Sequence, residues 1–303
     1  MNPCKLQGGA RTDLRAKISH KIRNVFRSKL ARAAKPFDWN NDPAMIDARL
    51  SKIGPIKIKD QHQSYSCSGQ AGAYWVGIVY AVLHNLPYTE ISARSIYAPI
   101  RYPYGGGATD GDLQNQIANV GALEEAILSS YYPDGTTDEA LFLDTSFETP
   151  PNMILETKYG GWVKVSVDNT PEAIAEAIRD NVAVLWHIDS HFDGGAPEFW
   201  LSNYPRYAGQ SDEGHFMCAH RAYLSNSVPT IQALQSFGTE VPNGVQNFDS
   251  NNYLGTPRMV DIFTFVTKFV PHPTNPGQMI PNPAIISWQQ RLVNFFLSLF
   301  SQQ

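Results

Sequence analysis

The stretch DQHQSYSCSGQAGAYWVGIVYAVLHNL, residues 60–86, places a cysteine where a polar segment passes into a long apolar one. From Ser68 to Leu86 the residues are almost all small or apolar, and the run is too long for one strand, so it predicts a buried helix. Cys67 would then lie at the start of that helix, facing the positive end of its dipole. Such a field favours the thiolate, the nucleophile of cysteine hydrolases. Taken singly, however, a cysteine before an apolar helix is more often a structural residue of the core.

The residues around Cys67 resemble the active-site segment of the papain-like cysteine peptidases. Gln61 lies six residues before Cys67, where that family places a glutamine whose side-chain amide supports the oxyanion. The resemblance implies that the backbone N–H of Cys67 is the second oxyanion donor. It also implies a two-lobed α+β fold, with a helical N-terminal lobe, a β-rich C-terminal lobe and the active site in the cleft between them.

The resemblance also implies that a histidine follows on a strand, and GHFMCAHRAY at 214–223 provides His215. It lies 148 residues after Cys67, within the range of about 130 to 150 known for such pairs. His220 is at an odd offset from His215 on the same strand, so only one of the two can face Cys67. His187 and His191 lie where the family has no catalytic residue, and we interpret them as structural or rim residues.

The family orients its histidine with an asparagine at the start of the next strand, and Asn247 in VQNFDS is the candidate. It follows an apolar, alternating entry and precedes RMVDIFTF, which resembles the closing strand of the family. The segment SNSVPTIQALQSFGTEVPNG between His215 and Asn247 then reads as an insertion, which makes the spacing longer than usual. The alternatives are Asn243, Asn251 and Asn252.

Glycines at 105–107, in YPYGGGATDGDLQ, resemble the glycine-rich wall of the family. By that resemblance, backbone groups of Gly106 and Gly107 would hold an extended substrate in a β-like pairing. Three adjacent glycines are also typical of an ordinary turn. Three other positions depart from the family: Ser68 replaces an aromatic, Asp249 replaces a tryptophan, and Ser64 replaces a cysteine of a family disulfide.

The rest of the chain changes from a helical to a strand pattern near residue 161. We expect an extended lead-in at 37–61 with a short strand at Ile56 to Ile58. The expected helices cover 68–86, about 110–120, 123–129 and 171–181, the last capped by Thr170. The expected strands cover 161–167, 182–189, 215–225, 244–250 and 258–270. Helices followed by strands indicate an α+β architecture.

Basic residues are concentrated at the N-terminus, where the first 35 residues hold 10 of the 24 lysines and arginines and a single acid, Asp13. Residues 12–34 have helical apolar spacing, which predicts a basic amphipathic helix. The arm either folds back on the acidic body or grips an external anion, such as nucleic acid, an anionic membrane or an acidic protein surface. We divide the chain into this arm (1–36), a peptidase domain (37–270) and a Pro-rich connector with an apolar C-terminal helix (271–303).

Three cysteines cannot form a disulfide framework, and together with the absence of a signal peptide they favour a reducing, intracellular compartment. No apolar stretch approaches the length of about 18 residues that a membrane span needs. No phosphate loop or zinc spacing is present, so we expect neither cofactor nor metal; Asp189, Ser190, His191 and Asp193 read as a polar loop.

The sequence therefore predicts a cysteine peptidase that cleaves peptide bonds with a Cys67, His215 and Asn247 triad and with Gln61 in the oxyanion hole. The alternative is a papain-like scaffold of weak or no activity. It would serve as an assembly component, in a virus or phage particle for example, docked through residues 1–36 and 284–303.

Overall fold

The computed structural model describes residues 10–11, 36–103, 106–145, 162–189, 213–250, 254, 259–267, 269–272 and 275–281. The helices expected at 12–34 and within 284–303 lie outside the described residues, so the arm and tail as docking segments stay predictions. In the part of the chain that is described, no helix combines the length and the apolar character needed to cross a membrane.

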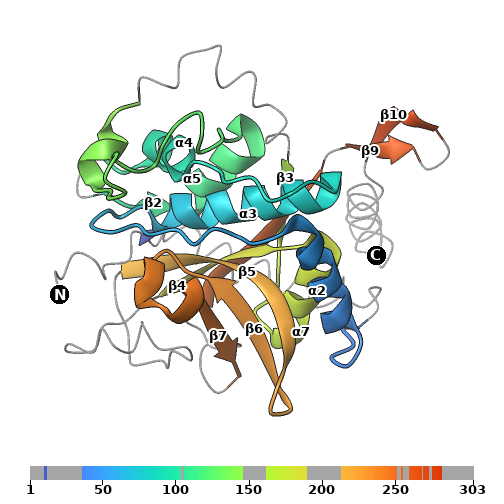
Figure 1. Ribbon diagram of the computed structural model, residues 1–303. Helices are drawn as coiled ribbons and strands as arrows, with labels where there is room; N and C mark the ends of the chain where they lie inside the picture. The colour runs from blue at the N-terminus through green and yellow to red at the C-terminus, as the bar shows by residue number, and fades with distance from the viewer. Residues whose placement is uncertain are drawn as a thin grey trace, which may run out of the picture.

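Eight strands form one sheet with the order β2-β1-β5-β4-β8-β3, and β6 pairs with both β5 and β7 (Figure 1). These strands are β1 (Ala10–Arg11), β2 (Ala108–Thr109), β3 (Trp162–Ser166), β4 (Val184–Asp189), β5 (Glu213–Ser225), β6 (Val228–Leu234), β7 (Val245–Asp249) and β8 (Met259–Thr267). All pairs are antiparallel except β1 with β2. A separate hairpin, β9 (Phe269–His272) with β10 (Asn275–Pro281), occupies part of the expected Pro-rich connector.

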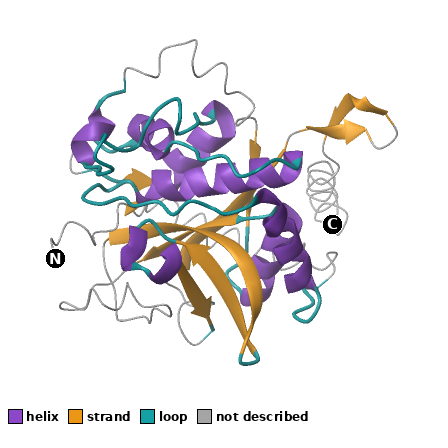
Figure 2. Ribbon diagram, in the orientation of Figure 1, coloured by secondary structure: helices purple, strands orange, loops and turns teal. Residues whose placement is uncertain are grey.

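Helices lie on the sheet in two groups, as Figure 2 shows in purple. They are α2 (Asp42–Ile53), α3 (Cys67–His84), α4 (Ala93–Tyr97), α5 (Asp110–Asn115), which continues as one wide turn over Gln116–Val120, and α7 (Pro171–Asn181). α3 lies along the sheet with α4 and α5 beyond it, and α2 and α7 pack together at one end. The fold is therefore α+β, as expected; the division into two lobes with a cleft, and the domain boundaries, stay predictions.

α3 is the central helix because small residues let its neighbours approach closely. A Cβ on Gly69 would lie 2.5 Å from Tyr97 Cβ and 2.7 Å from Ala93 O, so α4 packs directly on the α3 backbone. On the sheet side, Trp75 meets Trp162 and Phe265 edge to face, with ring centroids 5.1 and 4.9 Å apart. Apolar residues around the whole circumference of α3 are thus buried between two layers.

The structure departs from the sequence expectations in several elements. α2 forms within the segment expected to be extended, because Ile46, Leu50 and Ile53 share one buried face and a proline near its start is compatible with a helix. Residues 56–58 form no strand, and residues 123–129 form turns instead of a helix. β6 lies inside the segment read as an insertion.

Candidate active site

Cys67 is the first residue of α3, and its side chain is fully buried. Hydroxyl contacts close the turn before it: Ser64 Oγ lies 2.7 Å from Ser66 Oγ, and Gln70 Nε2 donates to Ser66 Oγ at 3.2 Å. The first N–H groups of a helix have no carbonyl partner within it, so they carry partial positive charge. Cys67 therefore lies at the positive end of the dipole of α3.

His215 lies on β5, with 1% of its surface exposed. Its Nε2 is 2.7 Å from Oε1 of Gln235, and its ring stacks on Phe237 with centroids 4.6 Å apart and planes 12° from parallel. Because an amide oxygen can only accept, Nε2 carries the proton and Nδ1 is the basic nitrogen of the neutral ring. Gln235 and Phe237 thus fix both the tautomer and the orientation of the imidazole.

The structure corrects the expectation that Asn247 orients His215. Asn247 of β7 pairs with Gln232 of β6, which pairs in turn with Arg221 of β5. Arg221 is six residues from His215, or about 20 Å along an extended strand. Asn247 Oδ1 instead accepts from Tyr223 Oη at 2.6 Å and from Gln232 Nε2 at 3.1 Å. Gln235 occupies the place at His215 Nε2 that was expected for asparagine.

Gln61 is buried and lies beside the residues that hold His215. Its N–H donates to Ser236 O at 2.7 Å, and its Oε1 accepts from Ser236 Oγ at 2.6 Å. Its Nε2 donates to Ser64 O at 3.2 Å, in the turn that leads into Cys67. The amide oxygen is therefore held on the Ser236 side and the amide nitrogen on the side of the turn before Cys67.

The glycine-rich segment is held from inside the protein, although Gly107 was expected to bind the substrate. Its N–H donates to Tyr97 Oη at 2.7 Å, and its carbonyl accepts from Tyr102 N at 2.8 Å. Gly106 has φ 71°, and a Cβ there would lie 2.7 Å from Glu139 Oε1. The strand pairing takes place at the next residues, Ala108 and Thr109 of β2; for Gly106, substrate binding stays a prediction.

β1 lies between β2 and the start of β5, directly beside His215. Ala10 pairs in parallel with Ala108 on one side and antiparallel with Gly214, the residue before His215, on the other. An extended backbone thus fits between the segment after the glycines and the strand that carries the histidine. Nothing in the sequence marked Ala10 and Arg11 as a strand, because two residues have no periodicity.

His187 is fully buried, so it is a structural residue and not a residue of the rim. Its Nδ1 lies 3.0 Å from Oδ1 of Asp110, the first residue of α5, and its ring stacks on Phe216. A Cβ on Gly214 would lie 1.7 Å from His187 Nε2, so position 214 admits only glycine while the histidine keeps its place. The pair therefore joins β4 to the segment that follows β2.

Comparison with known proteins gives matches at the level of structure. No protein-family model matches the chain, and no curated protein matches its sequence. Procathepsin B S9 from Trypanosoma congolense aligns with a TM-score of 0.56 and 13% identity, over 87% of this chain and 86% of that one. Xylellain, a cysteine protease from Xylella fastidiosa, aligns with a TM-score of 0.57 and 13% identity, over 77% and 90% of the two chains. The chain has the papain-like fold. The bromelain protease from Ananas comosus also aligns, with a TM-score of 0.52 and 15% identity, over 78% of this chain and all of that one.

Sequence reasoning missed Gln235, the residue whose side chain contacts Nε2 of His215. The family pattern used above is an asparagine with a tryptophan two residues later. Gln235 and Phe237 keep the amide and the aromatic at that spacing, 20 residues after His215 instead of 32. The sequence does contain this pattern of an amide followed by an aromatic residue. It was missed because only asparagine was considered for the amide, and because the segment that contains Gln235 was interpreted as an insertion.

Two buried histidines, His215 and His220, are expected to make the stability of the fold depend on pH. Burial lowers the pKa of His215 to about 4, against a smaller opposing effect of the Gln235 contact, and burial lowers the pKa of His220 to about 3. In the unfolded chain both titrate near 6.5, so between these values the unfolded state binds more protons. We expect the free energy of unfolding to be level above about pH 6.5 and to fall by about 2 kcal/mol per histidine between pH 7 and pH 5.

The measurement is urea unfolding at both pH values, with His220→Gln as the matched variant. The variant should lose about 2 kcal/mol less than the wild-type chain over that interval. An equal loss in the two proteins would show that His220 is not buried in its neutral form.

Proposed function

We propose that the chain is a papain-like cysteine peptidase in which Cys67 is the nucleophile, His215 the base, Gln235 the residue that orients His215, and Gln61 an oxyanion donor. The contact that carries the proposal is the 2.7 Å bond from His215 Nε2 to Gln235, with Phe237 stacked on the ring. This contact leaves the basic nitrogen of the imidazole on the side away from Gln235, as a general base requires.

In the acylation step, His215 Nδ1 takes the proton of Cys67 as the sulfur attacks a peptide carbonyl. The C–S bond forms and the carbonyl electrons move to oxygen, where the Cys67 N–H and the Gln61 amide nitrogen donate hydrogen bonds. As the oxyanion collapses, the C–N bond breaks and His215 returns the proton to the leaving amine.

In the deacylation step, water attacks the thioester and gives its proton to His215. The C–S bond then breaks, the acid product leaves, and the sulfur regains its proton. Gln235 accepts from Nε2–H throughout, so it supports the imidazolium that forms in each step.

The position of β1 supports a peptide as the substrate class. Ala108 on one side and Gly214 on the other already pair with an extended backbone next to His215. A substrate would use the same edges once Ala10 and Arg11 have left them, with backbone hydrogen bonds supplying affinity.

The test is labelling of the full chain with iodoacetamide across pH, followed by mass mapping of the modified cysteines. Cys218 is the internal control, because it is also fully buried and burial raises the pKa of its thiol far above the ordinary value. We expect Cys67 to be labelled faster than Cys218 well below the ordinary thiol pKa of about 8.5.

Two variants complete the test. His215→Ala should remove the rapid labelling of Cys67. Ala10→Pro should not lower it, because proline weakens the β1 pairing and replaces none of the four proposed site residues. Equal, slow labelling of Cys67 and Cys218 in the wild-type and Ala10→Pro chains would contradict the peptidase and favour a scaffold without activity.

A further inference from the structure

Tyr74 connects the helix of Cys67 to both of the segments that surround it. It lies seven residues, about two turns, after Cys67 on α3 and is fully buried. Its hydroxyl accepts from the N–H of Lys59 at 2.6 Å and donates to the backbone carbonyl of Gln235 at 3.2 Å. Burial raises the pKa of Tyr74 well above its ordinary value, so the hydroxyl keeps the proton that it donates.

The two partners of Tyr74 belong to two segments that are paired with each other. Lys59 O accepts from Gly238 N at 3.1 Å, and Gln61 N donates to Ser236 O at 2.7 Å. We call residues 59–61 and 235–238 the site ladder. It carries the oxyanion donor on one segment and the partner of His215 on the other, so a shift of the ladder moves both groups together.

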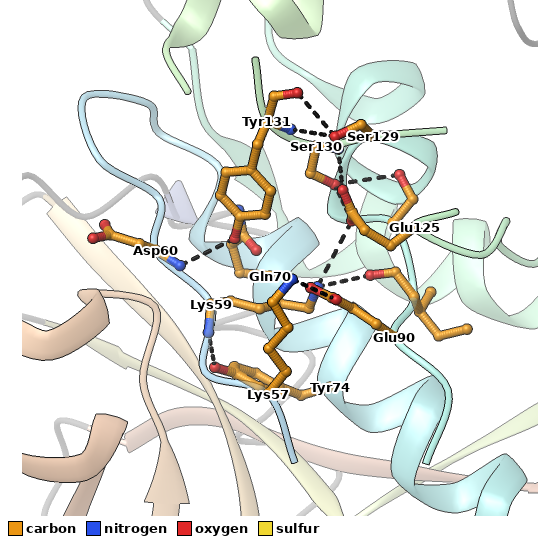
Figure 3. Close-up of polar contacts among 12 residues, drawn as sticks. Lys57, Lys59, Asp60, Gln70, Tyr74, Glu90, Glu125, Ser129, Ser130 and Tyr131 are labelled. Atoms are coloured by element: carbon orange, nitrogen blue, oxygen red, sulfur yellow. Dashed lines mark hydrogen bonds and ion pairs between the residues drawn. The ribbon is translucent and has the colours of Figure 1, made fainter. Parts of the chain in front are cut away.

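The segment 59–61 of the site ladder is anchored by the buried side chain of Lys59, as Figure 3 shows. Lys59 Nζ donates to Ile91 O at 2.8 Å and lies 3.4 Å from Glu90 Oε1 and 3.9 Å from Glu125 Oε2. The next amide, that of Asp60, donates to Tyr131 Oη at 3.1 Å. These contacts hold the ladder to the loops around residues 90 and 125, whereas the Tyr74 hydroxyl holds it to α3.

We infer that Tyr74 is a positioning residue for the proposed peptidase reaction, holding Gln61 and Gln235 at a fixed place relative to Cys67. This inference rests on the proposed function. Removing the hydroxyl leaves the Lys59 amide and the Gln235 carbonyl without this partner and removes the Tyr74 link between the ladder and α3. The nucleophile, the base and the oxyanion donor then lose their mutual alignment, although none of them has been changed.

The test compares Tyr74→Phe with Tyr88→Phe in the full chain. Tyr88 is the matched control because its hydroxyl is also buried but has no hydrogen-bond partner among the described residues. We expect Tyr74→Phe to lower kcat for a peptide substrate by about tenfold or more, with KM changed by less than about threefold. Tyr88→Phe should leave both constants within about twofold of the wild-type values.

Hydrogen exchange of backbone amides gives a readout that does not depend on activity. In Tyr74→Phe, the amides of Lys59, Gln61 and Gly238 should exchange about tenfold faster or more, and in Tyr88→Phe they should not. Unchanged exchange in Tyr74→Phe, or a KM effect without a kcat effect, would overturn the inference. A wild-type chain that hydrolyses no peptide contradicts the proposed function, and the exchange comparison then decides alone whether Tyr74 holds the ladder.

Discussion

Replacing Gln235 by alanine is expected to lower kcat/KM for peptide hydrolysis by about 100-fold. The side chain of Gln235 supplies the acceptor for Nε2–H of His215 at 2.7 Å. Without it, Phe237 still stacks on the ring, but nothing at position 235 selects the tautomer with a basic Nδ1. The loss should lie mainly in kcat, because the orienting contact supports the imidazolium and is not placed against the substrate.

Asn247→Ala is the matched control for this experiment. It also removes a buried amide, but one whose partners are Tyr223 and Gln232. Asn247 is level with Arg221 in the sheet, about 20 Å along β5 from His215. We expect kcat/KM to stay within about twofold, with a lower melting temperature from the lost hydrogen bonds. A large loss in Asn247→Ala together with full activity in Gln235→Ala would restore the assignment made from the sequence.

Local pattern was sufficient to locate the helix that begins at Cys67. The buried run after Cys67 forms α3 with bounds close to those expected, since a long apolar segment of small residues has few other solutions. Gln61 and His215 were named from their order and spacing. The structure places Gln61 against Ser236 and His215 against Gln235, which are neighbours in the chain.

Tertiary contacts explain what the sequence could not supply. Gly107 was expected to face the substrate, but Tyr97 and Tyr102 use both of its backbone groups, and neither contact has a sequence signal. The pairing edge therefore starts at Ala108. β6 was missed for a different reason. Because the expected asparagine was placed at position 247, the segment before it was interpreted as an insertion, so neither β6 nor Gln235 was recognised.

Weakening the β1 pairing is expected to raise the labelling rate of Cys67 by about thirtyfold. Cys67 and His215 are at most 1% exposed, and β1 is paired to Gly214 immediately before His215. Replacing both Ala10 and Arg11 by proline removes two backbone donors, and each ladder bond contributes about 1 kcal/mol, so the population with an open β5 edge should rise by that factor.

Arg11→Ala is the control for the proline variant, because it keeps every backbone donor of β1. The measurement is the rate of iodoacetamide labelling at Cys67, with Cys218 followed in the same sample. A thirtyfold rise at Cys67 alone would show that β1 limits access to the site. A rise at both cysteines would indicate loosening of the whole fold, and no rise would mean that β1 does not limit access to Cys67.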